Sequence, residues 1–469
     1  MEWPFGPYET VMGAILLMTI PLQRLLTRDE PGMRVPLSEL FEEIKEKGYK
    51  WHISIFVVMY GFKAFIDHHN EAIKPRVGGF THYVHGLEGG FTLWVQETFR
   101  NGVLSDVLSF HYLFVYLFLI WFSPMYYILC RDEVMADKAV LNYFVAYVLA
   151  VPLYLFFNIE VTSSFLPGMD ALMYHRSWNL FFFTEADPLD NGFPSLHIGI
   201  PLGLLAINRL HVKGLGIEMR EWRHREFDLF VAANVPIYLF SIQYLGIHWI
   251  SDVVPGAILA IICALFAHNM QPKLRSLREN GLASLIPARK VAYTSAAFSL
   301  IGAFILLAVV VDGPGTDDDA PTMRVGPGDV NLDVIEVHSL WHPADVEIRN
   351  VGDEAVEVLI IHRDSVEGHA KGGVIEWSSL SVDDARLLEP GDSLNQQVET
   401  PSVYDGHFVL VTNQEGSGVG EVRITIEYVD GSLLWSAVIS SIPAFAITGL
   451  VIGGLYFSED EVSEKIANE

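Results

Sequence analysis

Long apolar stretches recur along this sequence, and they constrain its fold more than any other feature. About 20 consecutive apolar residues are needed for a helix to cross a bilayer, and nine stretches approach that length. The chain is 51% hydrophobic and only 19% charged, which is too little charge for a water-soluble domain of 469 residues. The predicted spans are residues 9–26, 50–67, 107–130, 139–161, 196–211, 228–245, 249–268, 291–311 and 434–456.

The connections between these spans differ in their content of Lys and Arg. Before residue 312, about 18 basic residues fall in one set of connections and about 4 in the opposite set. Basic connections stay on the cytoplasmic side of a membrane, so the first set is predicted to be cytoplasmic. The N-terminus and residues 312–433 are then expected outside the cell membrane, and the C-terminus inside.

Residues 312–433 follow a different pattern. Alternating apolar and polar residues at 346–358, 406–411 and 421–428 predict strands, and Gly352-Asp353 marks a turn between two of them. With 25 acidic and 6 basic residues, the region has a net charge of about −19. We expect a small β-sandwich-like domain. It is either a solvated acidic cap or a binding module for a glycan or an extracellular partner.

Together these patterns predict an all-α polytopic membrane helix bundle, with an extracytoplasmic all-β domain inserted before the last transmembrane helix. The net charge of −27 argues against nucleic-acid binding. The acidity, with arginine favoured over lysine, resembles proteins of salt-loving archaea. The predicted domains are an N-terminal span with its cytoplasmic connection (1–49), a catalytic transmembrane core (50–268), a cytoplasmic connection with the eighth span (269–311), the β domain (312–433), and the final helix with its tail (434–469).

A short polar segment, Asn191-Gly192-Phe193-Pro194-Ser195-Leu196-His197, precedes the fifth span. Proline and serine are typical of the start of a helix. The free backbone N–H groups of a first helical turn can cradle a phosphate. His197, one or two residues inside the helix, would then face the bound group.

A second segment, His248-Trp249-Ile250-Ser251-Asp252, joins the sixth and seventh spans. His248 and Asp252 are four residues apart, so on a helix they would share one face. A carboxylate there fixes the imidazole tautomer and leaves the other nitrogen free to attack. Each motif alone occurs by chance, and a single interfacial histidine is usually a solvated residue. Both motifs are predicted on the outer face, and this agreement favours catalysis by two histidines, one as nucleophile and one as acid.

These residues resemble the type-2 phosphatidic acid phosphatase superfamily. Its pattern is a Lys/Arg segment, then Pro-Ser-Gly-His, then Ser-Arg-x5-His-x3-Asp. Pro194-Ser195-Leu196-His197 resembles the second part, and Ser241-Ile242 with His248 and Asp252 has the spacing of the third. Leucine stands for glycine at position 196, and isoleucine for the phosphate-binding arginine at 242. Both departures resemble the branch of inositol phosphorylceramide and sphingomyelin synthases. The resemblance covers about residues 50–268.

The resemblance implies a metal-independent histidine phosphatase or phosphotransferase without a cofactor. His248 would be the nucleophile, His197 the general acid, and Asp252 the orienting carboxylate, while Ser195 helps to hold the phosphate. Because a phosphoryl group in transit needs cationic partners, other residues must replace the missing arginine. The candidates, in order, are Arg176, then Arg76 and Lys74, and then Lys63 within the second span. The spacing of His68, His69, His82, His85 and His111 fits no standard zinc site, so no metal is predicted.

The leading hypothesis is therefore a lipid phosphatase that hydrolyses a lipid-linked phosphate ester through a phosphohistidine on the outer membrane face. The alternative is a phosphotransferase that moves an inositol-phosphate type of head group to a lipid alcohol, because one intermediate can accept water or an alcohol. A hypothesis of another class is a non-catalytic membrane scaffold that presents the β domain to a partner.

Overall fold

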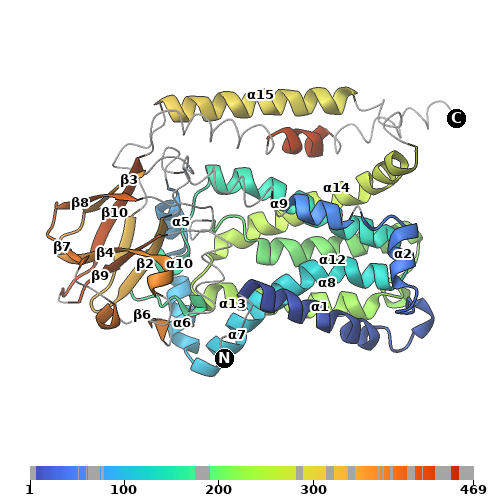
Figure 1. Cartoon of the computed structure of the whole chain (residues 1–469), viewed down its shortest axis with the longest axis horizontal. Coiled ribbons are helices and arrows are strands. Elements are labelled where there is room, and N and C mark those ends of the chain that lie inside the picture. The colour runs from blue at the N-terminus through green and yellow to red at the C-terminus, as the bar shows by residue number, and fades with distance from the viewer. Residues whose placement is uncertain are drawn as a thin grey trace.

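In the computed structural model, the chain forms a bundle of long helices and a separate region of antiparallel sheet (Figure 1). Apolar helical runs account for the bundle, and period-two patterns account for the sheets. The structure describes residues 7–50, 52–59, 61, 74, 79–174, 191–280, 289–312, 322–335, 344–366, 370–371, 374–375, 377–380, 384–398, 407–414, 416–427 and 445–453.

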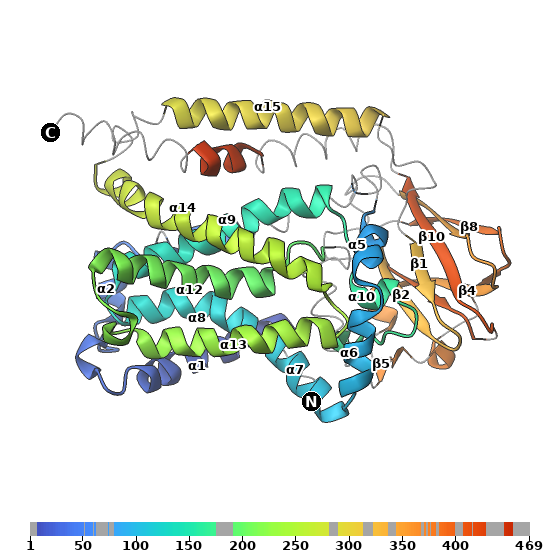
Figure 2. The same cartoon turned by 180° about the vertical axis from the view of Figure 1, so that it is seen from behind.

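The bundle has α12 at its centre. This helix packs against α9, α13 and α14, while α8 packs against both α9 and α1 (Figures 1 and 2). On α12, Ile200, Leu204 and Ile207 recur at helical spacing and are fully buried in the apolar core. The bundle helices are α1 (Pro7–Leu26), α8 (Tyr116–Leu129), α9 (Glu133–Phe156), α12 (Leu196–Leu215), α13 (Arg225–Tyr244) and α14 (Val253–Asn280).

Four helices among the described residues are long and apolar enough to cross a membrane. They are Gly102–Leu129, Glu133–Phe156, Ile250–Ser276 and Lys290–Ala308, and they confirm four of the predicted spans as membrane-length helices. α12 and α13 have 20 residues each but are not among the four. Inward-facing polar side chains such as Asn208 and Asp228 lower their mean hydropathy. Much of the predicted spans 50–67 and 434–456 lies outside the described residues.

Shorter helices gather at the end of the bundle where α12 begins. They are α5 (Thr81–Glu88), α6 (Phe91–Phe99), α10 (Thr162–Phe165) and η3 (Leu172–Tyr174). α7 (Gly102–Phe110) runs into α8 through η2 (His111–Val115), a π-helical turn. The side chain of Asn101 caps α7 by accepting a hydrogen bond from Leu104 N.

The opposite end of the bundle is tied together by charged groups. Asp132 caps α9 by accepting from Met135 N at 3.0 Å, and it also forms an ion pair of 2.7 Å with Arg223. Glu133 pairs with Lys47 and with Arg275 of α14. These contacts link the start of α9 to its neighbours. The remaining short helices there are η1 (Pro31–Met33), α2 (Leu40–Glu46) and η4 (Met219–Glu221).

Two four-stranded antiparallel sheets make up the β region, in the orders β1-β10-β3-β8 and β2-β9-β4-β7. Apolar residues from both sheets share one core. The prediction of antiparallel strands in 312–433 is therefore confirmed. The larger strands are β1 (Thr322–Val325), β2 (Val330–Ile335), β3 (Ala344–Asn350), β4 (Val356–His362), β7 (Arg386–Leu388), β8 (Ser393–Val398), β9 (His407–Thr412) and β10 (Gly420–Glu427), and β5 (Ala370–Lys371) pairs with β6 (Val374–Ile375).

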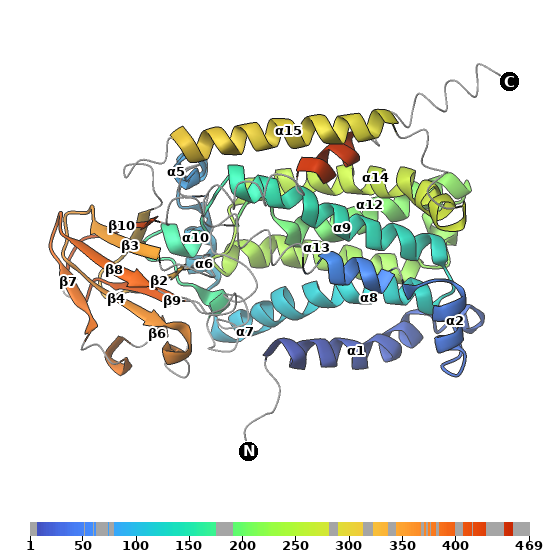
Figure 3. The ribbon, with the colours of Figure 1, turned by 45° about the horizontal axis from the view of Figure 1, so that its top comes forward.

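The β region contacts the bundle through α10 (Figure 3). Asn331 Nδ2 of β2 donates to the carbonyl oxygen of Ser164 at 3.1 Å. The guanidinium of Arg324 lies over the ring of Phe165, 5.5 Å from its centroid. Phe165 in turn lies beside Trp249, at a centroid distance of 5.9 Å. The sheets therefore reach the segment that carries the second motif.

α15 (Arg289–Asp312) runs alongside the bundle but stands apart from it (Figures 1 and 3). Its partner is the helix at 445–453, to which Ser295 Oγ donates a hydrogen bond at the carbonyl of Ala446, 2.7 Å away. A Cβ at Gly449 would lie 2.6 Å from Ser295 Cα, so glycine allows this close approach. Only 11% of the apolar, membrane-length part of α15 is buried.

Candidate active site

The two motifs predicted from the sequence meet at one end of the bundle. His197 is the second residue of α12, and His248 lies in the connection between α13 and η5 (Ile250–Asp252), which leads into α14. The two imidazole rings are 6.0 Å apart between centroids, and both are buried. Asp252, fully buried, completes the predicted catalytic set. The structure thus brings together three residues that span 55 positions of the chain.

Among the described residues, His248 makes hydrogen bonds through one imidazole nitrogen. Its Nδ1 lies 2.8 Å from the carbonyl oxygen of Gly192 and 3.3 Å from Asp252 Oδ2. A carbonyl oxygen can only accept, so Nδ1 carries the proton and donates it. In the neutral ring the lone pair then resides on Nε2. The closer acceptor belongs to the first motif, so one hydrogen bond links the two motifs directly.

The expectation that His248 and Asp252 share one face of a helix is wrong. His248 precedes the helical residues, and the pair is joined by a capping turn in which Trp249 N donates to Asp252 Oδ2 at 3.0 Å. The carboxylate must satisfy the free N–H groups at a helix start, and this places it beside the imidazole. The spacing of four residues still brings the side chains together, but through a turn.

Gly192 occupies a position that admits no side chain. A Cβ there would lie 2.7 Å from the carbonyl oxygen of Ile159 and 3.6 Å from Asp252 Oδ2. Gly192 N donates to that same Ile159 oxygen at 2.9 Å, and Asn191 forms a parallel bridge with Ile159. The carbonyl group that holds His248 is therefore fixed by a neighbouring strand-like segment.

The starts of α12 and α14 pack without room for larger residues. Ser195 N donates to the carbonyl of Asp252 at 3.3 Å. A Cβ on Gly256 would lie 2.5 Å from the carbonyl oxygen of Ser195, and one on Gly199 would lie 3.1 Å from that of Gly256. Backbone contact at this distance fixes the two helix starts, and hence the two histidines, relative to each other.

Several polar atoms at this junction lack partners. Within the described part of the chain, Ser195 Oγ, His197 Nε2 and Asp252 Oδ1 are buried and make no hydrogen bond. Burying an unsatisfied polar group costs free energy, so these three atoms, from residues that meet at the junction, favour the binding of a polar ligand or water here. Ser195 occupies the N-cap position of α12, yet its hydroxyl does not cap the helix. The group is free for a bound oxygen.

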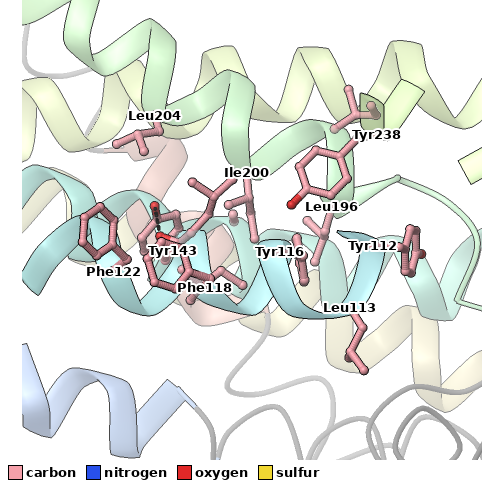
Figure 4. Packing of buried hydrophobic residues seen from close by; sticks show 14 of the residues in the cluster. Tyr112, Leu113, Tyr116, Phe118, Phe122, Tyr143, Leu196, Ile200, Leu204 and Tyr238 are labelled. Atoms are coloured by element: carbon pink, nitrogen blue, oxygen red, sulfur yellow. Dashed lines mark hydrogen bonds between the residues drawn. The ribbon is translucent and has the colours of Figure 1, made fainter. Parts of the chain in front are cut away.

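Aromatic side chains cover the rest of the junction. Tyr112, Tyr116 and Tyr238 surround the start of α12 near Leu196 (Figure 4). The rings of Tyr112 and Tyr116 stack on His197 at centroid distances of 3.7 Å and 3.9 Å. No role for these tyrosines is predicted from the sequence, because a tyrosine in an apolar helix is usually a core residue.

Of the cationic residues predicted to bind the phosphate, the structure describes Lys74. Lys74 is 2% exposed, and its Nζ donates to Asn191 Oδ1 at 2.8 Å, which brings it to the first motif. The other candidates, Arg76, Arg176 and Lys63, lie outside the described residues. Ile242 stands at the expected arginine position and is fully buried, with its carbonyl accepting from His248 N at 3.0 Å.

Glu88 contributes a contact that the sequence did not predict. Its carboxylate accepts hydrogen bonds from the backbone N–H groups of Ile250 and Ser251, at the start of η5. The segment 86–91, where α5 ends and α6 begins, therefore lies beside the second motif. His85 packs its ring near Phe165 and Trp249, and His111 is hydrogen-bonded to Asn234, so each has an aromatic or polar partner.

No family model, curated protein or solved structure matches the chain. The resemblance to the phosphatase superfamily accordingly stays a prediction that rests on two short segments. Any function must be argued from the chemistry of the site, because a fold alone does not define one.

Proposed function

We propose that this protein is an integral membrane lipid phosphatase that hydrolyses a lipid-linked phosphate ester through a phosphohistidine. The observation that carries the proposal is the hydrogen bonding of His248. Its Nδ1–H is held by Gly192 O and Asp252, which leaves Nε2 as the nucleophile in the neutral ring. A second buried histidine, His197, lies 6.0 Å away between ring centroids, and its Nε2 makes no hydrogen bond with a described residue.

The chemistry follows from these two rings. His248 Nε2 attacks phosphorus, the P–N bond forms, and the P–O bond to the lipid alcohol breaks. His197 gives its Nε2 proton to the leaving oxygen. Water then attacks the phosphohistidine, His197 takes a proton from it, and the P–N bond breaks to release inorganic phosphate. Asp252 stabilises the positive charge that develops on His248.

The phosphate oxygens would be held by neutral and cationic groups together. The Ser195 hydroxyl and the first N–H groups of α12 can donate to them. Lys74 is the described cation that contacts the first motif, and Arg76 and Arg176 remain candidates. This arrangement would replace the arginine that the superfamily pattern has at position 242.

The proposal also includes the location of the site relative to the membrane. We place the apolar helices across a cell membrane, and the bias of basic residues puts the motif end of the bundle outside. The β region and the N-terminus would then be extracytoplasmic, and the C-terminus cytoplasmic. A substrate anchored in the outer leaflet would reach the site without leaving the membrane.

A phosphotransferase is the second candidate, since a lipid alcohol in place of water would take the same phosphoryl or head-group phosphate. A non-catalytic scaffold that presents the β region is the candidate of another class. It explains the sheets but gives no reason for three buried polar atoms at the junction that make no hydrogen bond with any described residue.

Turnover by the purified full-length protein tests the proposal. We expect release of phosphate from one or more members of a panel of lipid phosphates and diphosphates, no effect of EDTA, and a base-stable, acid-labile phosphoenzyme. His248→Ala abolishes both signals, and His197→Ala slows turnover by roughly 100-fold or more. His268→Ala, in the middle of α14 where the His268 ring contacts Lys138, is the matched control. Loss of activity with EDTA, or undiminished activity in His248→Ala, contradicts the mechanism.

A further inference from the structure

The imidazole ring of His197 lies between two tyrosine rings. The planes of Tyr112 and His197 differ by 18° at a centroid distance of 3.7 Å, and those of Tyr116 and His197 by 29° at 3.9 Å. Two rings cannot occupy the same face of an imidazole at such distances, so the tyrosines cover opposite faces. This arrangement fixes the plane of the imidazole, while its Nε2 edge is buried without a hydrogen bond to a described residue.

The backbone that carries the tyrosines is itself unusual. Tyr112 lies in the π-helical turn η2, and Tyr116 is the first residue of α8. Such turns inside α-helices are rare and occur often at functional sites. His111 of the same turn lies 2.7 Å from Asn234 Oδ1 through its Nε2, which ties the turn to α13. Both tyrosines are buried, at 2% and 8% exposure, so their rings have little freedom to move.

We propose that Tyr112 and Tyr116 are positioning residues that clamp His197 for proton delivery, an inference that rests on the proposed function. Among the described residues, no hydrogen bond holds His197 Nε2, and the two stacked tyrosine rings restrict rotation of the imidazole. In the first chemical step the P–Nε2 bond to His248 forms and the P–O bond breaks. The clamp acts on the accompanying transfer of the proton from His197 Nε2 to the leaving oxygen.

A pair of substrates with different leaving groups tests the clamp. Octyl phosphate releases an alkoxide and needs a general acid, whereas 4-nitrophenyl phosphate releases a stable phenolate and does not. We expect Tyr112→Leu to lower kcat/KM for octyl phosphate by roughly 100-fold, and for 4-nitrophenyl phosphate by less than about threefold. His197→Ala should show the same selectivity. Tyr112→Phe, which keeps the aromatic face, should retain most of the turnover.

Tyr143→Leu is the matched control for general damage. Tyr143 is a fully buried tyrosine of α9 that contacts Ser123 rather than the site. Its replacement should affect both substrates equally. Equal losses on both substrates in Tyr112→Leu would show that this tyrosine only supports the fold, and the clamp would be wrong.

A measurement without turnover separates this inference from the proposed function. Deuterium exchange at the C2 position of His197, followed by mass spectrometry in the full-length protein, reports on the surroundings of the ring. We expect it to accelerate in Tyr112→Leu and to stay at the wild-type rate in Tyr112→Phe. Unchanged exchange in Tyr112→Leu overturns the clamp even if the enzyme is active. An inactive wild type with accelerated exchange in the variant instead contradicts only the proposed function.

Discussion

At the scale of single residues, the site depends on a backbone carbonyl as much as on side chains. The acceptor closest to His248 Nδ1 is Gly192 O, and this group does not titrate. The tautomer of His248 is therefore held by a neutral acceptor together with the Asp252 carboxylate. The sequence predicted the carboxylate from its spacing, but it could not predict the carbonyl, because backbone groups leave no pattern of residue types.

The role of that carbonyl leads to a prediction for Gly192→Ala. The new Cβ would lie 2.7 Å from Ile159 O, a backbone atom, so the turn must shift and carry its carbonyl away from His248. We expect kcat to fall by roughly 100-fold with the fold retained. Steady-state kinetics with the best lipid phosphate measures the effect. Gly102→Ala, with nothing within 4 Å of the added Cβ, is the control. Wild-type kcat in Gly192→Ala would remove the carbonyl from the mechanism.

The other site residues that the sequence did not predict also lack a recognisable sequence pattern. Tyr112, Tyr116 and Glu88 reach the site from helices distant in the sequence, and nothing local marks them among other aromatic or acidic residues. In contrast, His197 and His248 were predictable because each stands in a short segment whose polar residues interrupt an apolar pattern.

At the scale of elements, apolar runs predicted the long helices, and alternation predicted strands at 346–358, 406–411 and 421–428. The sequence did not predict which strands pair with one another. β3 and β4 follow each other across the turn at Gly352-Asp353, yet they belong to different sheets, where β3 pairs with β10 and β8, and β4 with β9 and β7. Alternation gives the face of each residue in a strand but not the neighbour of the strand.

The start of α9 yields a prediction about pH. Burial raises the pKa of Asp132, but His224, Met135 N and Arg223 together lower it well below the ordinary range. A carboxyl with a lowered folded-state pKa stabilises the fold above its unfolded pKa of about 4, and the effect disappears as the pH falls toward the folded value. Asp132→Asn should therefore lower the Tm at pH 7, and the difference from wild type should shrink below about pH 4.

Thermal unfolding in detergent between pH 7 and pH 3 measures this difference. Asp29→Asn serves as the control, since Asp29 is 78% exposed in its pair with Arg28 and should contribute little. A constant difference in Tm across this range would show that the contribution of Asp132 does not come from its charge.

At the scale of the whole molecule, the β region is attached at the segment that supports the site. Ser163 N donates to Gly246 O at 3.0 Å, and Trp249 Nε1 donates to Glu160 O at 2.9 Å, so the 160–165 segment holds the connection that carries His248. The sheets contact that segment from the other side. The sequence predicted the sheets but not this attachment, because no residue pattern records which surface a domain covers.

This attachment predicts that loosening the β region slows catalysis. In the double variant Arg324→Ala with Asn331→Ala, both contacts to α10 are removed, and we expect kcat/KM to fall by about tenfold through misplacement of His248. The exposed Arg386 of β7 supplies the control, Arg386→Ala. Equal kinetics in the double variant and the control would mean that the sheets cover the site region without influencing it.

The π-helical turn at η2 carries an additional consequence for how such a chain can change. A turn of this kind contains one residue more than the α-helical turn it replaces. Removing one of residues 113–115 would convert it to α-helix and place Tyr112 and Tyr116 three positions apart instead of four. Their rings would then lose the spacing that lets them stack on opposite faces of His197. A single-codon deletion would thus disrupt this stacking while leaving His197, His248 and Asp252 in the gene.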